Sequence, residues 1–146
     1  MLASALGAKL LGLPCEGEDA VKTVLIADDE PNLRLLVSAT IASDEYEVVQ
    51  AADGNQAWDL MLRHRPAVAL LDIEMPGRTG LDLARAIRAH PDLLETQVIM
   101  LTSRAQRLDI EAGLAAGANI YLTKPFSPLE LLTVVERAMG IDDPLG

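Results

Sequence analysis

The apolar run at residues 67–72 limits the possible folds of this chain more than any other stretch, because it shows no alternation of polar and apolar side chains. Such a run is typical of a strand buried on both faces, as in parallel sheets that helices cover on either side. It ends in a single carboxylate, Asp72, and the turn-forming pair Pro76 and Gly77 follows shortly after it. Open parallel sheets bind ligands beyond the carboxyl ends of their strands, so Asp72 lies where a ligand would be bound.

The composition sets limits on the class of protein. With 146 residues, half of them hydrophobic, the chain is long enough for one domain with a single core. A net charge of -10 argues against direct binding of nucleic acid, which depends on clustered Lys and Arg. No run approaches the roughly 20 apolar residues of a membrane span, and the one cysteine, Cys15, cannot form an internal disulfide. These features fit a protein of the reducing cytoplasm.

Strand and helix signals alternate along the chain after residue 20. Apolar, β-branched runs predict strands at residues 21–27, 46–51, 67–72, 97–101 and 119–122. Helices are expected to start at Pro31, Gly54 and Pro128 and to cover residues 81–90 and 104–116. Five such units predict an α/β fold: a doubly wound, five-stranded parallel sheet in the order 2-1-3-4-5 with helices on both faces, as in flavodoxin-like proteins.

The two ends of the chain differ from this alternating part. Residues 1–20 turn from a Leu- and Ala-rich composition to an acidic one, which predicts a flexible N-terminal extension. We therefore expect the domain over residues 21–140 and a C-terminal tail over residues 141–146. On this interpretation the chain is either a stand-alone domain or a fragment of a longer protein.

The apolar positions of two predicted helices indicate which faces are buried. The second helix is expected to turn four residues inward: Ala57, Trp58, Met61 and Leu62. Because Trp58 lies among these residues at helical spacing, we interpret it as a core residue rather than a binding aromatic. The last helix is expected to bury Leu131, Leu132, Val135 and Ala138.

Polar side chains of related chemistry follow four of the predicted strands. In the order 2-1-3-4-5 the first and third strands are neighbours, which brings Asp28, Asp29 and Asp72 together. Crowded carboxylates repel one another unless a cation lies among them, and oxygen ligands without His or Cys favour Mg²⁺. Lys124 and the hydroxyl of Thr102 complete a set suited to a phosphoryl group, with Asp72 as the nucleophile. Singly, each residue has an ordinary structural explanation, and only the combination indicates a site.

Five short motifs resemble the receiver domain of two-component response regulators, of the chemotaxis-regulator kind, over about residues 21–139. They occupy residues 26–30, 71–77, 101–103, 117–118 and 121–126, in the order and at the spacing of that family. The resemblance implies that Asp72 is phosphorylated by a phosphohistidine of a sensor histidine kinase or a phosphotransfer protein. It also implies that Asp29, Asp72 and the backbone carbonyl of Glu74 bind Mg²⁺ directly, and that Asp28 acts through water.

The same resemblance implies a conformational switch. Lys124, which in the family precedes Pro125 across a cis peptide, pairs with the phosphate. Thr102 moves to hydrogen-bond a phosphoryl oxygen, and Tyr121 turns inward and repacks the face made by the fourth helix, fifth strand and fifth helix. Such a domain catalyses only its own phosphorylation and dephosphorylation. It signals through that face to a second copy, an effector protein or an output domain.

Two further expectations concern the surroundings of the site. Glu74 and Arg104 each lie two residues past a site residue, and the resemblance implies that they set the lifetime of the phosphoryl group. Ile110, Ile120 and Val134 occupy positions where one transcription-factor branch has ionic dimer contacts. We therefore expect an apolar output face here in place of a salt-bridged dimer.

Two other functions remain open from the sequence. A phosphohydrolase of the haloacid-dehalogenase kind also uses a parallel sheet, Mg²⁺ and a lysine, but its nucleophile follows the first strand in an Asp-x-Asp pattern. Here the isolated Asp72 follows the third strand and belongs to an Asp-x-Glu pattern. A receiver-like module that works by contact alone would be indicated by the loss of an acidic residue, Thr102 or Lys124, and all of these are present.

Overall fold

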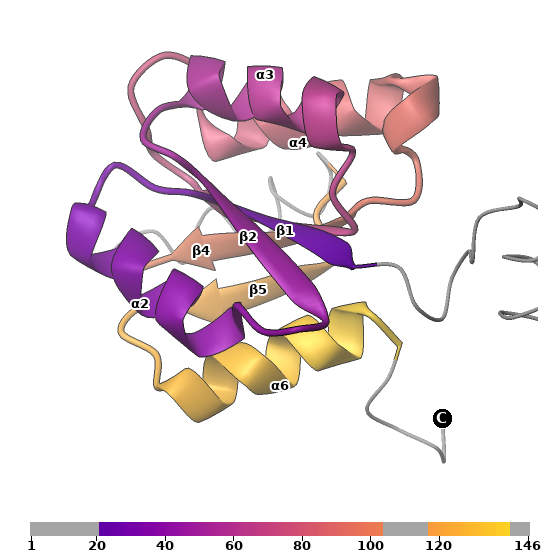
Figure 1. Ribbon diagram of the computed structural model, residues 1–146. Helices are drawn as coiled ribbons and strands as arrows, with labels where there is room; N and C mark the ends of the chain where they lie inside the picture. The colour runs from indigo at the N-terminus through magenta and orange to yellow at the C-terminus, as the bar shows by residue number, and fades with distance from the viewer. Residues whose placement is uncertain (1–20, 104–116, 141–146) are drawn as a thin grey trace, which may run out of the picture.

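The computed structural model describes residues 21–103 and 117–140, which form a five-stranded parallel sheet in the order β2-β1-β3-β4-β5 (Figure 1). The strands are β1 (Lys22–Ala27), β2 (Tyr46–Ala51), β3 (Val68–Asp72), β4 (Gln97–Thr102) and β5 (Ile120–Thr123). All neighbouring strands pair in parallel. The predicted doubly wound, flavodoxin-like sheet is therefore confirmed, and each predicted strand end agrees with the structure to within one residue.

Helices cover both faces of the sheet. They are α2 (Pro31–Ile41), α3 (Gly54–His64), α4 (Gly80–Ala89) and α6 (Pro128–Ala138), with a short 3-10 helix, η2 (Pro91–Leu93), that was not predicted. Figure 1 shows α3 and α4 on one face and α2 and α6 on the other. The helix expected at residues 104–116 lies outside the described residues, as do the two expected terminal segments. Within the described ranges, no helix has the length and apolar character needed to cross a membrane.

The core consists of two layers, one on each face of the sheet. All five residues of β3 are buried, as expected for a central strand covered on both sides. Successive strand residues point to opposite faces, so Leu71 packs in the layer under α3 and α4, and Leu70 packs in the layer under α2 and α6. Trp58 is partly buried against the first layer, in line with its interpretation as a core residue.

Local hydrogen bonds fix where the helices begin. Thr79 and Ser127 each start a helix with a capping box, in which the side chain accepts from the backbone N–H of the third helical residue and that residue's carboxylate accepts in return. The side chain of Asp53 accepts from the N–H of Gln56 at the start of α3. These helix starts hold the loops that follow the strands, where the candidate site lies.

Two apolar residues lie on faces other than the predicted ones. Leu62 was expected to be inward, but it is 41% exposed. Each residue turns a helix by about 100°, so Leu62 lies well round from the buried face that is centred on Ala57 and Met61. Val134 was expected on an apolar output surface, but it is buried because it follows Leu131 by three residues on the inward face of α6.

Candidate functional site

Three carboxylates meet where β1 and β3 end. These strands are adjacent, with Ala27 opposite Leu71, so the residues that follow, Asp28 and Asp72, lie side by side. One carboxylate oxygen from each of Asp28, Asp29 and Asp72 lies within 4.8 Å of the others. Asp28 and Asp72 are buried, and Asp29 is exposed. The structure thus brings together the three acidic residues that the strand order predicted to be neighbours.

Asp28 is the most completely enclosed of the three. Its Oδ1 accepts a hydrogen bond from the N–H of Glu30 at 2.9 Å, and its Oδ2 accepts one from Lys124 Nζ at 2.7 Å. The guanidinium of Arg34 donates to the backbone carbonyl of Asp28 at 2.6 Å. Because its donors come from the loop after β1, from α2 and from the loop after β5, Asp28 has a fixed position in the site.

Lys124 brings the positive charge to this cluster. Its Nζ lies 3.6 Å from Asp72 Oδ1, in addition to its shorter contact with Asp28. Its backbone N–H donates to the carbonyl of Thr102 at 2.6 Å, and its peptide bond to Pro125 is cis, as the resemblance implied. Burial works against its charge, but the hydrogen bond to Asp28 and the charge of Asp72 outweigh this and raise the pKa of Lys124.

The pKa of the Asp72 carboxyl is raised above its ordinary value of 3.8. Burial and the neighbouring charge of Asp28 raise its pKa to about 6, although Lys124 and the N–H of Glu74 act in the opposite direction. That N–H donates to Asp72 Oδ1 at 3.4 Å. A carboxyl held in this way is ready to lose its proton when a cation enters the cluster, because the cation offsets the crowded negative charge.

The remaining predicted residues lie at different distances from this cluster. Thr102 is fully buried at the end of β4, one position past the residue that pairs with Asp72, and its hydroxyl donates to the carbonyl of Ser103 at 3.2 Å. Tyr121 lies on β5 and packs, partly buried, against the core layer under α3 and α4. Glu74, two residues past Asp72, is exposed. Arg104 lies outside the described residues.

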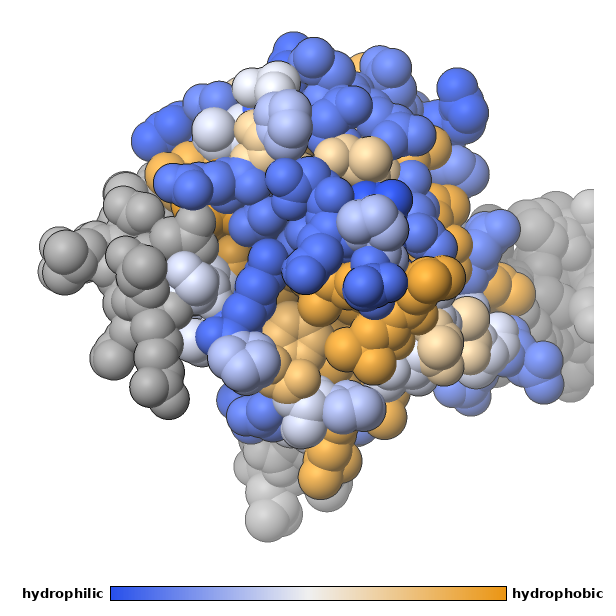
Figure 2. Space-filling view, turned by 90° about the vertical axis from the view of Figure 1, so that its left-hand side faces the viewer, coloured by the Kyte–Doolittle hydropathy of each residue, from blue (hydrophilic) through white to orange (hydrophobic). Residues whose placement is uncertain are grey.

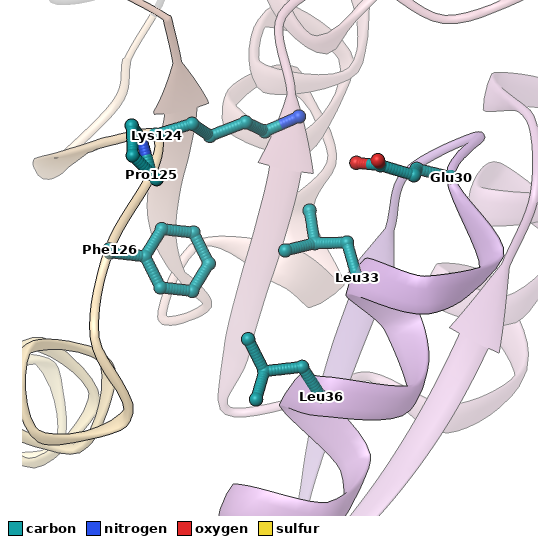
Figure 3. Close-up of a pocket in the computed structure, with 6 residues that line it drawn as sticks. All are labelled: Glu30, Leu33, Leu36, Lys124, Pro125 and Phe126. Carbon is teal, nitrogen blue, oxygen red and sulfur yellow. The ribbon is translucent and has the colours of Figure 1, made fainter.

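An apolar cleft beside the cluster was not predicted from the sequence. It has a volume of about 350 Å³ and lies between the start of α2 and the loop after β5. Figure 3 shows Leu33, Leu36 and Phe126 pointing toward one another across it, with Glu30 and Lys124 at one end. In Figure 2 an orange, apolar patch adjoins the blue, polar residues on the side of the molecule that carries the strand ends. The only sequence signals for this cleft are the spacing of the two leucines and the single Phe of the chain.

Comparison with known proteins decides the family. The family model described as the response regulator receiver domain matches residues 24–136. The chain belongs to this family. Receiver domains are signalling modules of two-component systems rather than enzymes that turn over an external substrate, so the match decides against the phosphohydrolase alternative.

Individual relatives agree with this assignment. The receiver is 36% identical over 123 residues to the phosphate regulon transcriptional regulatory protein PhoB of Pseudomonas aeruginosa. The aligned region is 84% of this chain and 54% of that protein. The chain therefore spans about half the length of this curated relative. The structure of the chemotaxis response regulator CheY4 of Vibrio cholerae superposes on this chain with a TM-score of 0.76 and 34% sequence identity. The match covers 82% of this chain and 99% of the CheY4 chain.

A third relative bears on the metal. The receiver domain of the sensor histidine kinase PA1611 of Pseudomonas aeruginosa superposes on this chain with a TM-score of 0.74 and 35% sequence identity. The match covers 83% of this chain and 99% of the PA1611 receiver chain. Its crystal structure has a magnesium ion coordinated in the active site cleft. In the present receiver the cluster of Asp28, Asp29 and Asp72 offers oxygen ligands alone, which fits a hard divalent cation.

Proposed function

We propose that this receiver domain accepts a phosphoryl group on Asp72 from a phosphohistidine of a sensor histidine kinase or a phosphotransfer protein. The observation that carries the proposal is the position of the Asp72 carboxylate, at the end of the central strand, beside a buried acid and 3.6 Å from a lysine amine. A nucleophile and a fixed positive charge in such proximity suit the transfer of a phosphoryl group.

Mg²⁺ is the cofactor of this proposal. Asp29, Asp72 and the backbone carbonyl of Glu74 would bind it directly, and Asp28 would act through water. Support comes from the three carboxylate oxygens that lie within 4.8 Å of one another, because a cluster of Asp residues offers the oxygen ligands that Mg²⁺ prefers. When bound, the ion neutralises charge on the carboxylates and on the phosphoryl oxygens.

The chemical step needs little beyond these groups. A carboxylate oxygen of Asp72 attacks the phosphorus, the P–N bond to the donor histidine breaks, and an acyl phosphate results. Lys124 then pairs with a phosphoryl oxygen, and its raised pKa keeps it charged for this role. Attack of water on the phosphorus later releases inorganic phosphate and restores the carboxylate. Glu74 and Arg104 are expected to control the access of that water.

The apolar cleft supplies a place for the protein donor. Lys124 lines both the cleft and the site, so a protein surface that packs against Leu33, Leu36 and Phe126 would lie next to Asp72. A partner that carries the phosphohistidine beside apolar side chains would bury this patch when its phosphoryl group reaches the nucleophile. The cleft thereby gives a physical reason for preferring a protein donor to a small phosphorylated compound.

The output follows from the switch residues. Thr102 is expected to bond a phosphoryl oxygen and Tyr121 to turn inward, which would change the face that contains β5 and α6. A second copy, an effector protein or an output domain would recognise that face. The net charge of -10 favours a protein partner over direct contact with nucleic acid. We expect that partner to be cytoplasmic.

Intact-mass measurement tests the proposed phosphorylation. The full chain is treated with acetyl phosphate, with Mg²⁺ or with a chelator, and compared with Asp72→Asn and with the exposed-residue control Asp59→Asn. We expect one added phosphoryl group in the wild type and in the control, only with Mg²⁺, and none in Asp72→Asn. Equal labelling of Asp72→Asn and the wild type would overturn the assignment.

A further inference from the structure

The loop between β3 and α4, residues 73–79, is attached to the start of α3 at two points. The N–H of Gly54 donates to the carbonyl of Pro76 at 2.9 Å. The guanidinium carbon of Arg78 lies 5.2 Å from the centre of the Trp58 ring, within the range of a cation–π contact. A loop held by a backbone hydrogen bond and by an aromatic platform has a defined position relative to α3.

Gly54 makes this close approach possible. A Cβ at this position would overlap the carbonyl oxygen of Arg78 and would lie 2.6 Å from the backbone N and C of the same residue. These are backbone atoms, so no change of rotamer could relieve the clash and the loop itself would have to move. Gly54 therefore determines how near the loop lies to α3.

The same loop carries the backbone of the proposed metal site. Glu74 lies two residues after Asp72 and two before Pro76, and Met75 between them is buried in the core. At the base of the loop, the N–H of Gly80 donates to the carbonyl of Ile73 at 2.9 Å. Backbone hydrogen bonds therefore restrain the loop on both sides of Glu74, at Ile73 before it and at Pro76 after it. The position of the Glu74 carbonyl depends on both.

We propose that Gly54, together with the pair formed by Arg78 and Trp58, positions the Glu74 carbonyl for Mg²⁺ and makes the site selective for that small ion. The inference rests on the proposed function, which gives this carbonyl to the metal. Mg²⁺ requires nearly ideal octahedral geometry at about 2.0–2.1 Å, whereas Ca²⁺ accepts longer and more variable distances. A displaced carbonyl would consequently weaken Mg²⁺ binding more than Ca²⁺ binding.

Calorimetric titration of the full chain with Mg²⁺ and with Ca²⁺ tests this role. In Gly54→Ala we expect Mg²⁺ affinity to fall by about tenfold, as is typical when groups that orient a ligand are changed. Ca²⁺ affinity should fall less, so that the ratio of the two affinities changes. Leu62→Ala is the matched control, because it alters an exposed residue on the same helix. The ratio of Mg²⁺ affinity to Ca²⁺ affinity in Leu62→Ala should equal that of the wild type.

The possible outcomes separate this inference from the proposed function. A wild-type chain that does not bind Mg²⁺ would overturn the proposed function itself. Normal binding by the wild type, with the same ratio of affinities in Gly54→Ala, would overturn only the positioning role. If Gly54→Ala does not fold, Trp58→Leu decides, since it removes the platform for Arg78 without a change of charge. An unchanged ratio in Trp58→Leu would then reject the inference.

Discussion

Asp72 couples the stability of the fold to pH. Its pKa in the folded chain is about 6, above its ordinary value of 3.8, because of burial and the charge of Asp28. The folded chain therefore binds more protons than the unfolded chain between these two values. The stabilisation that results is complete below about pH 4 and is lost as the pH rises through about 6.

We predict that Asp72→Asn weakens this dependence. Between pH 5 and pH 7.5, in a chelator, the free energy of unfolding of the wild type should fall by about 1 kcal/mol more than that of the variant. Urea unfolding at the two pH values measures the difference. Parallel changes in the two proteins would show that Asp72 does not titrate in this range.

Glu74 and Arg104 provide a second prediction about single residues. Glu74 is exposed and lies two residues past Asp72, so its side chain is expected to cover a phosphoryl group on Asp72. We expect Glu74→Ala and Arg104→Ala to lose the phosphoryl group several times faster than the wild type, because water reaches the acyl phosphate more easily. Glu47→Ala, which removes an exposed acid on β2, is the control. If both variants keep the wild-type lifetime, the two residues have no kinetic role.

The cleft between α2 and the loop after β5 leads to a prediction about two elements. Leu36→Asn places a polar side chain in the apolar part of the cleft and leaves the charges of the site unchanged. We expect at least a tenfold slower transfer from an autophosphorylated histidine kinase that labels the wild type, and an unchanged rate with acetyl phosphate. The loss corresponds to about 1.4 kcal/mol of lost interaction.

Leu94→Asn is the matched control for this test, because Leu94 is 57% exposed and does not line the cleft. It should behave as the wild type with both donors. If Leu36→Asn is phosphorylated as slowly by acetyl phosphate as by the kinase, the substitution damages the site itself. If its rate with the kinase equals that of the wild type, the cleft is ruled out as the docking surface.

The elements differ in how far the sequence predicts them. A strand such as β3 is predictable because burial on both faces requires an uninterrupted apolar run. The acidic cluster follows from the strand order, since adjacent strands that end in Asp must place those residues together. The cleft was missed because its walls, Leu33 and Phe126, are far apart in the sequence. The exposed Leu62 and the buried Val134 show that apolar spacing does not fix which of two neighbouring helix faces is covered.

The molecule as a whole raises the question of association. Val134 is buried and cannot contribute to an output surface, so Ile120, which is half-buried, is the residue of the three predicted for that surface that the described part of the chain leaves accessible. We predict that a beryllofluoride mimic of the phosphate promotes association and that Ile120→Asp prevents it, because a buried charge opposes an apolar contact.

Sedimentation of both proteins with and without the mimic measures this effect. Leu62→Asp on α3 is the control, since it adds the same charge to an exposed apolar position on the opposite face of the sheet. Association that survives in Ile120→Asp would exclude the face that contains β5 as the contact.

The ion pair between Lys124 and Asp28 joins residues 96 positions apart in the sequence. Contacts of such long separation form late in folding, because the loop between the partners must close before they can meet. During synthesis, Asp72 and the two acids that precede it leave the ribosome well before the lysine does. A nascent chain therefore carries Asp72 without its cationic neighbour, and the proposed phosphorylation site is complete only when almost the whole domain has been made and folded.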